Sequence, residues 1–212
     1  MKAIKLSKSC LAQKGRQILT KLINVEKIGS PTIENYVASG FSTSNYLKII
    51  DDVPFATATS FDITLCFTPK TIGIGNIFRD TSGNYTSGIY LSSSNNLQVA
   101  FNSSSGDSYF INYTSTEVFN VGTKYWVKVN YDGTTYNVKY STDGLSYTTI
   151  YSKASTAKLL TRGYTLGTST QSKYQYPFGG FIYLDECYIN INGQRWWSGY
   201  KDIIGTTYKI CG

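Results

Sequence analysis

Two adjacent carboxylates, Asp185 and Glu186, are the first residues in this sequence whose type and spacing could do chemistry. Paired carboxylates can act as general acid and nucleophile, and in retaining glycosidases they lie about 5–5.5 Å apart in one cleft. Residues 180–191 read as a single strand, in which neighbouring side chains point to opposite faces. The pair would therefore not share a substrate, and the chain has no histidine as an alternative base. We expect no catalytic residue and no enzyme.

The acidic pair then has two other interpretations. In the first, the inward carboxylate accepts hydrogen bonds from the backbone or from hydroxyl groups and stabilises the sheet, because a buried charge needs such partners. In the second, it helps to bind Ca²⁺, which takes about 6–8 oxygen ligands. The turns offer further oxygen ligands at Asp80, Asn84, Asp107 and Asp143. Nothing in the sequence brings these residues together, so we predict no metal and no cofactor.

The four cysteines, Cys10, Cys66, Cys187 and Cys211, are widely spaced and lack the close pairs that zinc sites use. Cys66 and Cys187 each lie within a predicted strand. We interpret them as small buried thiols, and a disulfide between neighbouring strands remains the alternative.

Tyrosine is abundant, with 19 residues in the chain, and several tyrosines lie in or beside polar loops. An exposed ring can stack on a pyranose face while its hydroxyl group bonds to the ligand. The candidate glycan-binding residues are Tyr85, Tyr109, Tyr174 and Tyr176, with Tyr113 a further loop tyrosine. The loop 174–178 is the strongest candidate. For each tyrosine the alternative is that it covers a sheet face.

From residue 36 onward, short strand patterns alternate with turn signals such as Asp132 with Gly133 and Asp143 with Gly144. The predicted strands are 46–50, 61–67, 75–79, 87–92, 96–101, 108–113, 124–131, 134–140, 146–151, 163–167 and 180–191. This pattern predicts an all-β, antiparallel sandwich. Trp126 is expected in the core. Alternation makes it difficult to bury both Trp196 and Trp197, so Trp197 is a candidate for docking onto a partner.

The N-terminal segment differs from the rest, and we predict a basic arm over residues 1–30 and a sandwich domain over 31–212. Apolar residues spaced for one helical face predict a short amphipathic helix whose docking candidates are Leu11, Arg16, Ile18, Leu19 and Leu22. Gly29 to Thr32 read as a linker. Such a helix is marginal alone in water. It would pack on its own domain, dock into a partner protein, or contact a membrane surface or nucleic acid.

The distribution of charge along the chain bears on nucleic-acid binding. Residues 1–28 hold seven of the 20 basic residues and only one of the 13 acidic residues, so the net charge of +7 belongs mainly to the arm. A nucleic-acid-binding surface over the whole protein is therefore not expected. No apolar run is long enough for a membrane span or a signal peptide.

Four segments, in order, resemble strands of laminin-G-like domains. Residues 124–133 (KYWVKVNYDG) are similar to the strand in which a tryptophan precedes a Tyr-Asp-Gly turn, and residues 180–189 (GFIYLDECYI) resemble the closing strand. Residues 61–67 (FDITLCF) and 87–91 (SGIYL) resemble two earlier strands. The resemblance covers about residues 36–192 and implies the concanavalin A-like jelly roll. It brings no activity with it, because function lies in sites and not in folds.

A cationic arm joined to a lectin-like sandwich is typical of phage virion proteins, such as head-fibre, decoration or tail-fibre components. This resemblance implies a non-enzymatic structural or adhesive protein, assembled in the host cytoplasm and located in the virion. Its expected partners are other virion proteins through the arm, host surface glycans, and further copies of itself in a homo-oligomer. A free-standing carbohydrate-binding lectin is the alternative.

Overall fold

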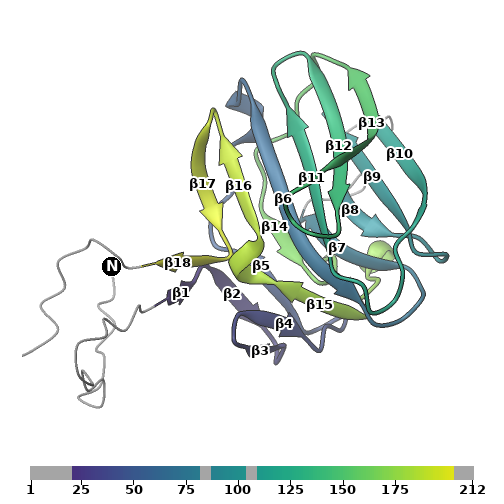
Figure 1. The fold of residues 1–212 in the computed structure, drawn as a ribbon. Coiled ribbons are helices and arrows are strands. Elements are labelled where there is room, and N and C mark those ends of the chain that lie inside the picture. Colours follow the sequence, from purple (N-terminus) through teal and green to yellow (C-terminus); the bar gives the residue numbers. More distant parts are fainter. Residues whose placement is uncertain (1–20, 82–86, 104–108, 203–212) are drawn as a thin grey trace, which may run out of the picture.

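Two antiparallel sheets packed face to face form the body of the molecule (Figure 1). The computed structural model describes residues 21–81, 87–103 and 109–202. The seven-stranded sheet has the order β10-β9-β8-β7-β14-β5-β2. Its strands are β2 (Val25–Ile28), β5 (Tyr46–Ile49), β7 (Gly75–Asp80), β8 (Gly88–Leu91), β9 (Asn96–Asn102), β10 (Tyr109–Val118) and β14 (Tyr164–Leu166).

The nine-stranded sheet has the order β13-β12-β11-β6-β15-β4-β3, and β16 and β17 continue it beside β6. Its strands are β3 (Thr32–Glu34), β4 (Val37–Ser39), β6 (Phe61–Pro69), β11 (Tyr125–Tyr131), β12 (Thr135–Ser141), β13 (Thr148–Ala154), β15 (Gly180–Tyr183), β16 (Tyr188–Ile191) and β17 (Gln194–Ser198). A separate ribbon pairs β1 (Lys21–Ile23) with β18 (Tyr200–Asp202). Among the described residues, no helix is long and apolar enough to cross a membrane.

Alternating side chains fill the space between the sheets, as the strand period of two requires. In β11, Tyr125, Val127, Val129 and Tyr131 are buried, and the residues between them are half-buried on the outer face. Aromatic rings dominate the core, with Phe78 stacked on Tyr164 at a centroid distance of 4.4 Å. The all-β antiparallel sandwich predicted from the sequence is confirmed.

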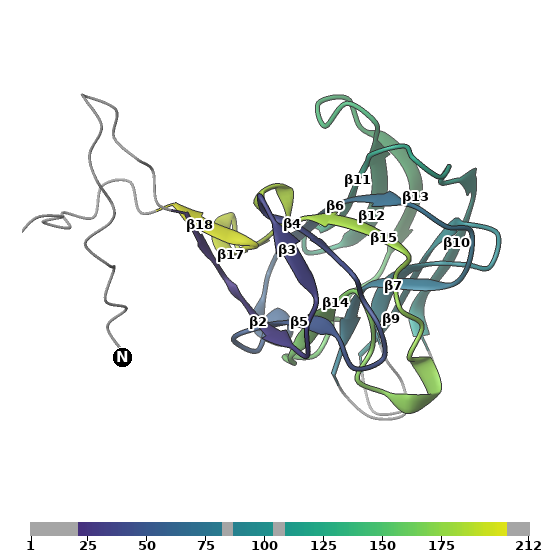
Figure 2. The same cartoon turned by 90° about the horizontal axis from the view of Figure 1, so that it is seen from below.

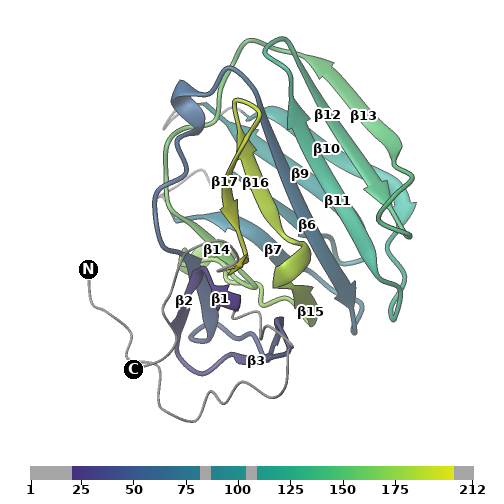
Figure 3. The same ribbon diagram turned by 60° about the vertical axis from the view of Figure 1, so that its left-hand side comes forward.

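The predicted strands are confirmed within a few residues, except the last. Residues 180–191 form two strands, β15 and β16, that pair with the same strand β6 and are separated by the 3-10 turn η3 (Leu184–Glu186). Figure 3 shows this turn as a short coil beside β6. The prediction of one continuous strand is therefore wrong, and so is the alternation of Asp185 and Glu186 that was inferred from it.

The predicted boundary at residue 30 is also wrong, because the sandwich begins before it. β2 pairs with β5 in the seven-stranded sheet, and the stretch from Gly29 to Pro31 is a turn that leads from one sheet to β3 in the other. In Figure 2, β3 and β4 lie above β2 and β5. Gly29 has φ of +71°, and the Ser30 N–H donates to Oδ1 of Asn45 at 2.9 Å, so this turn is anchored and is no free linker.

The predicted amphipathic helix is contradicted at its end, since Leu22 lies in strand β1. Leu11, Arg16, Ile18 and Leu19 lie outside the described residues, and their docking role stays a prediction.

Candidate functional site

Two of the predicted glycan-binding tyrosines meet on the seven-stranded sheet. The guanidinium carbon of Arg79, from β7, lies 4.7 Å from the ring centroid of Tyr90 and 5.0 Å from that of Tyr174. Tyr109 is close enough to interact electrostatically with Arg79, Tyr174 and Tyr90. We call these four residues the tyrosine–arginine cluster. Cation–π contacts of this kind contribute about 0.5–2 kcal/mol each, depending on burial.

Strand alternation places the cluster on the outer face of the sheet. Phe78, Ile89 and Leu91 point into the core, so Arg79 and Tyr90, their neighbours in β7 and β8, point outward.

The partner of Arg79 in the ladder is Gly88. A Cβ atom on Gly88 would lie 2.6 Å from Cδ of Arg79 and 2.8 Å from the carbonyl oxygen of Phe78. Only glycine leaves room for the arginine to cross this position toward Tyr90.

A buried amide holds the loop that carries Tyr174 and Tyr176. Nδ2 of Asn76 donates to the carbonyl oxygens of Tyr174 at 2.7 Å and Tyr176 at 3.1 Å, and the Asn76 N–H donates to Tyr176 at 2.9 Å. Asn76 is fully buried, so these bonds are shielded from water. The loop is therefore fixed to β7, and it includes the turn η2 (Ser172–Tyr174).

The cluster combines a rigid base with exposed ring surface. Arg79 is only 4% exposed, Tyr90, Tyr109 and Tyr174 are half-buried, and Tyr176 is 42% exposed. Burial raises the pKa of the Tyr109 hydroxyl, and nearby Arg79 opposes that rise. The Tyr109 hydroxyl group therefore stays protonated at neutral pH and can donate a hydrogen bond. Partly exposed rings held in place are suited to stacking on a sugar.

The structure thus places Tyr109 within electrostatic range of Tyr174 and places Tyr176 on the loop that carries Tyr174, whereas Tyr85 lies outside the described residues. Sequence reasoning missed Arg79 and Tyr90 because both lie within strands. A signal was present for Tyr90, which stands between the core residues Ile89 and Leu91 and must point outward.

Glu186 has a structural role on the outer face of the other sheet. It forms an ion pair with Lys124, and its Oε2 accepts a hydrogen bond from the Trp126 indole at 2.7 Å. The expectation of an inward carboxylate is therefore wrong, as is the expectation that Trp126 lies in the core. Trp126 is half-buried because it alternates with the core residues of β11.

The break at η3 places Cys187, the residue after the turn, beside Cys66. Cys66 lies in β6 opposite the turn, and its N–H donates to Sγ of Cys187 at 3.3 Å. Both thiols are fully buried and free. Burial raises the pKa of Cys187 to about 12 and that of Cys66 as well. The interpretation of these cysteines as buried thiols is confirmed.

The residues considered for calcium do not converge. Oδ2 of Asp80 is buried and bonds with Arg162 at 2.8 Å, and Oδ1 of Asp143 accepts the N–H groups of Leu145 and Ser146 within its own turn. Asn84 and Asp107 lie outside the described residues. Within residues 21–81, 87–103 and 109–202 there is no group of three or more His, Cys, Asp or Glu side chains that could hold a metal ion.

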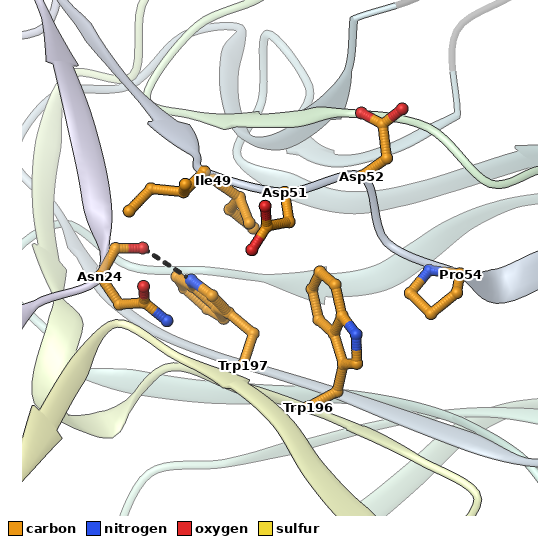
Figure 4. Close-up of a pocket in the computed structure, with 8 residues that line it drawn as sticks. Asn24, Ile49, Asp51, Asp52, Pro54, Trp196 and Trp197 are labelled. Atoms are coloured by element: carbon orange, nitrogen blue, oxygen red, sulfur yellow. Dashed lines mark hydrogen bonds between the residues drawn. The ribbon is translucent and has the colours of Figure 1, made fainter. Parts of the chain in front are cut away.

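Trp197 is in the core, which contradicts its predicted role in docking. It is 3% exposed, and its indole N–H donates to the Asn24 carbonyl oxygen at 2.9 Å (Figure 4). Trp196 lies at a β-bulge of β17, where the alternation is interrupted, and is half-buried against the core. Trp196 lines a pocket of about 370 Å³ together with Asn24, Ile49, Ile50, Asp51, Asp52, Pro54 and Trp197.

Solved structures of similar fold include animal, bacterial and phage proteins. The chain matches mouse laminin α1 domains LG4-5 with a TM-score of 0.50, 9% identity and coverage of 85% of this chain and 46% of that chain. It matches full-length tailspike protein 2 of the Escherichia coli O157:H7 bacteriophage CAB120 with a TM-score of 0.53, 10% identity and coverage of 85% and 27%. The Ruminococcus gnavus IT-sialidase CBM40 has a TM-score of 0.50, 14% identity and coverage of 71% and 90%.

These similarities identify the architecture. The fold is a concanavalin A-like jelly roll. The laminin-G-like resemblance expected from the four sequence segments is confirmed at the level of fold. The jelly roll spans less than half of the laminin chain and about a quarter of the tailspike chain. No protein-family model and no curated protein matches the sequence.

Proposed function

We propose that this jelly roll binds carbohydrate without catalysing a reaction, and that the tyrosine–arginine cluster is the binding site. The observation that carries the proposal is the position of Arg79 over the rings of Tyr90 and Tyr174, with Tyr109 within electrostatic range and exposed Tyr176 on the anchored loop. Tyrosine rings offer apolar faces to the C–H groups of a pyranose and hydroxyl groups to its polar edge.

The neighbours in fold support this function. They include a tailspike of a bacteriophage and the CBM40 of a sialidase, and a CBM40 is a carbohydrate-binding module. Because the identities are 10% and 14%, they support the fold, and the site itself rests on the contacts around Arg79.

The absence of catalysis is part of the proposal. Glu186 is engaged by Lys124 and Trp126, and Asp80 is buried against Arg162, so neither of these carboxylates is placed to attack or protonate a glycosidic bond.

Binding to a glycan array followed by calorimetry tests the proposal. Tyr109→Ala and Tyr174→Ala should each weaken the affinity for the best glycan by about 2- to 10-fold, the range expected for one aromatic contact. Tyr188→Ala is a matched control, because Tyr188 is a half-buried tyrosine of β16 in the other sheet. Unchanged affinity in both cluster variants, in folded protein, would remove the site.

We further propose that the protein is a virion component of a phage, such as a head-fibre, decoration or tail-fibre protein, presenting this site to host surface glycans. The segment before β1 would dock onto other virion proteins, and the assembly would contain several copies. Removing residues 1–20, which keeps all the described strands, should abolish incorporation into particles and leave glycan affinity unchanged. A free-standing lectin, the second possibility, would show no incorporation in either form.

A further inference from the structure

The pocket beside Trp196 differs from the other aromatic side chains of this protein in the charge of its neighbours. Elsewhere the chain places its own cation over a half-buried ring. Examples are Lys70 over Phe181 at 4.8 Å, Arg79 over Tyr90 at 4.7 Å, Lys124 over Trp126 at 4.8 Å, Lys128 over Tyr147 at 4.6 Å and Arg195 over Tyr188 at 3.6 Å. No lysine or arginine of the described residues lies over Trp196.

Carboxylates stand at this pocket instead. Asp51 and Asp52 are both exposed, and neither has a hydrogen bond or an ion pair with another described residue. Figure 4 shows the Asp51 carboxylate pointing toward the two indole rings and that of Asp52 pointing away from them. The lining contains no basic residue, so the pocket has a negative charge next to an aromatic face.

The pocket is built on fixed backbone. The Val53 N–H donates to the carbonyl oxygen of Arg162 at 2.8 Å, and Phe55, two residues later, is fully buried. These contacts hold the segment that carries Asp51. On the opposite wall, the bond from Trp197 to Asn24 ties β17 to the start of β2 and sets the position of Trp196. A ligand would meet a preformed site.

We infer that this pocket binds an organic cation, an ammonium or guanidinium group on an apolar stem. The cation would lie over the Trp196 indole and pair with Asp51, and the stem would contact Pro54 and Ile50, which is 55% exposed. The volume of about 370 Å³ suits a group of the size of an arginine or lysine side chain. Such a group can come from a partner protein or from a free alkylamine. The inference is independent of the proposed glycan site, which lies on β7 and β8.

Nuclear magnetic resonance of the full chain, with ¹⁵N-labelled tryptophan, tests the inference. Nα-acetyl-arginine amide represents a protein side chain and putrescine represents a free alkylamine. Titration with either should shift the Trp196 indole resonance in a saturable way and leave that of Trp126 in place. The tighter of the two probes identifies the source. Nα-acetyl-citrulline amide, which has the same shape without the charge, should bind at least tenfold more weakly.

Variants test the Asp51 carboxylate and the Trp196 ring separately. Asp51→Asn should weaken cation binding about tenfold, and Trp196→Ala at least as much, with Trp196→Phe as a milder change that keeps an aromatic face. Asp185→Asn removes a charge outside the pocket and should have no effect. Equal affinity for the citrulline and arginine probes, or an Asp51→Asn variant that binds as the wild type does, would overturn the inference. A lack of any saturable shift with both cations would do the same.

Discussion

The Trp126 indole donates a hydrogen bond to Glu186 at 2.7 Å. This bond joins β11 to the turn η3, which lies between β15 and β16 on the other side of β6. Lys124 forms an ion pair with the same carboxylate and lies 4.8 Å from the Trp126 ring centroid. The three side chains connect η3 to β11. The side chains of Lys124 and Glu186 are each 33% exposed, and Trp126 is half-buried. This arrangement stabilises the place where the closing strand breaks.

Replacing Glu186 with alanine should therefore lower the free energy of unfolding by about 1–2 kcal/mol, because the indole loses a charged acceptor and solvent moderates the ion pair. Glu186→Gln should cost less, since the amide oxygen can still accept the indole hydrogen bond. Urea unfolding followed by tryptophan fluorescence measures both changes. Asp185→Ala is the control and should be close to neutral. Equal losses in the Asp185 and Glu186 variants would contradict this role.

Much of the fold could be predicted because its signals are local. The turn at Asp132 is an example: Oδ1 accepts the N–H groups of Thr134 at 2.9 Å and Thr135 at 2.8 Å, which fixes the hairpin between β11 and β12. An Asp-Gly pair between two apolar strands predicts such a turn without knowledge of the rest of the chain.

The errors in prediction concern contacts between residues far apart in the sequence. The break at η3 is stabilised by Glu186 with Trp126 and by Cys187 with Cys66, and no local pattern in 180–191 shows these partners. The placement of β2 beside β5 is of the same kind. At the candidate site, polar loops could be recognised from composition, which identified Tyr109 and Tyr174. The arginine that joins them could not, because its position depends on Gly88 in the adjacent strand.

A buried hydroxyl group offers a test of core polarity. The hydroxyl oxygen of Tyr164 is fully buried and has no hydrogen-bond partner in the part of the chain that the structure describes, while its ring stacks on Phe78. Tyr164→Phe removes this unsatisfied group and keeps the ring. It should raise the free energy of unfolding by about 1 kcal/mol, because a buried polar group without a partner costs about 1–3 kcal/mol. A loss of stability, measured by urea unfolding at neutral pH, would show that the hydroxyl group is bonded in solution.

Alkaline pH should destabilise the protein through its buried thiols. Burial raises the pKa of Cys187 from 9.0 to about 12, so above about pH 9 the unfolded state releases this proton while the folded state keeps it. The stability present below pH 9 is then lost as pH rises toward 12, at up to about 1.4 kcal/mol per pH unit for one such group. Urea unfolding between about pH 8 and 11 measures this slope. Cys187→Ser, which cannot ionise there, should flatten it, and an equal slope in that variant would exclude Cys187 as the cause.

The room that Gly88 of β8 leaves for the Arg79 side chain of β7 should affect glycan affinity. A methyl group in Gly88→Ala would meet Cδ of Arg79 at 2.6 Å and the Phe78 carbonyl oxygen at 2.8 Å, so the arginine must leave its place between Tyr90 and Tyr174. We expect glycan affinity to fall about tenfold and stability by about 1–3 kcal/mol, the usual cost of overpacking. Arg79→Lys is the companion variant, because it keeps the charge and loses the planar group that stacks between the rings. It should weaken binding with a smaller loss of stability. If both variants fold and bind the glycan as tightly as the wild type, the cluster serves the sheet alone.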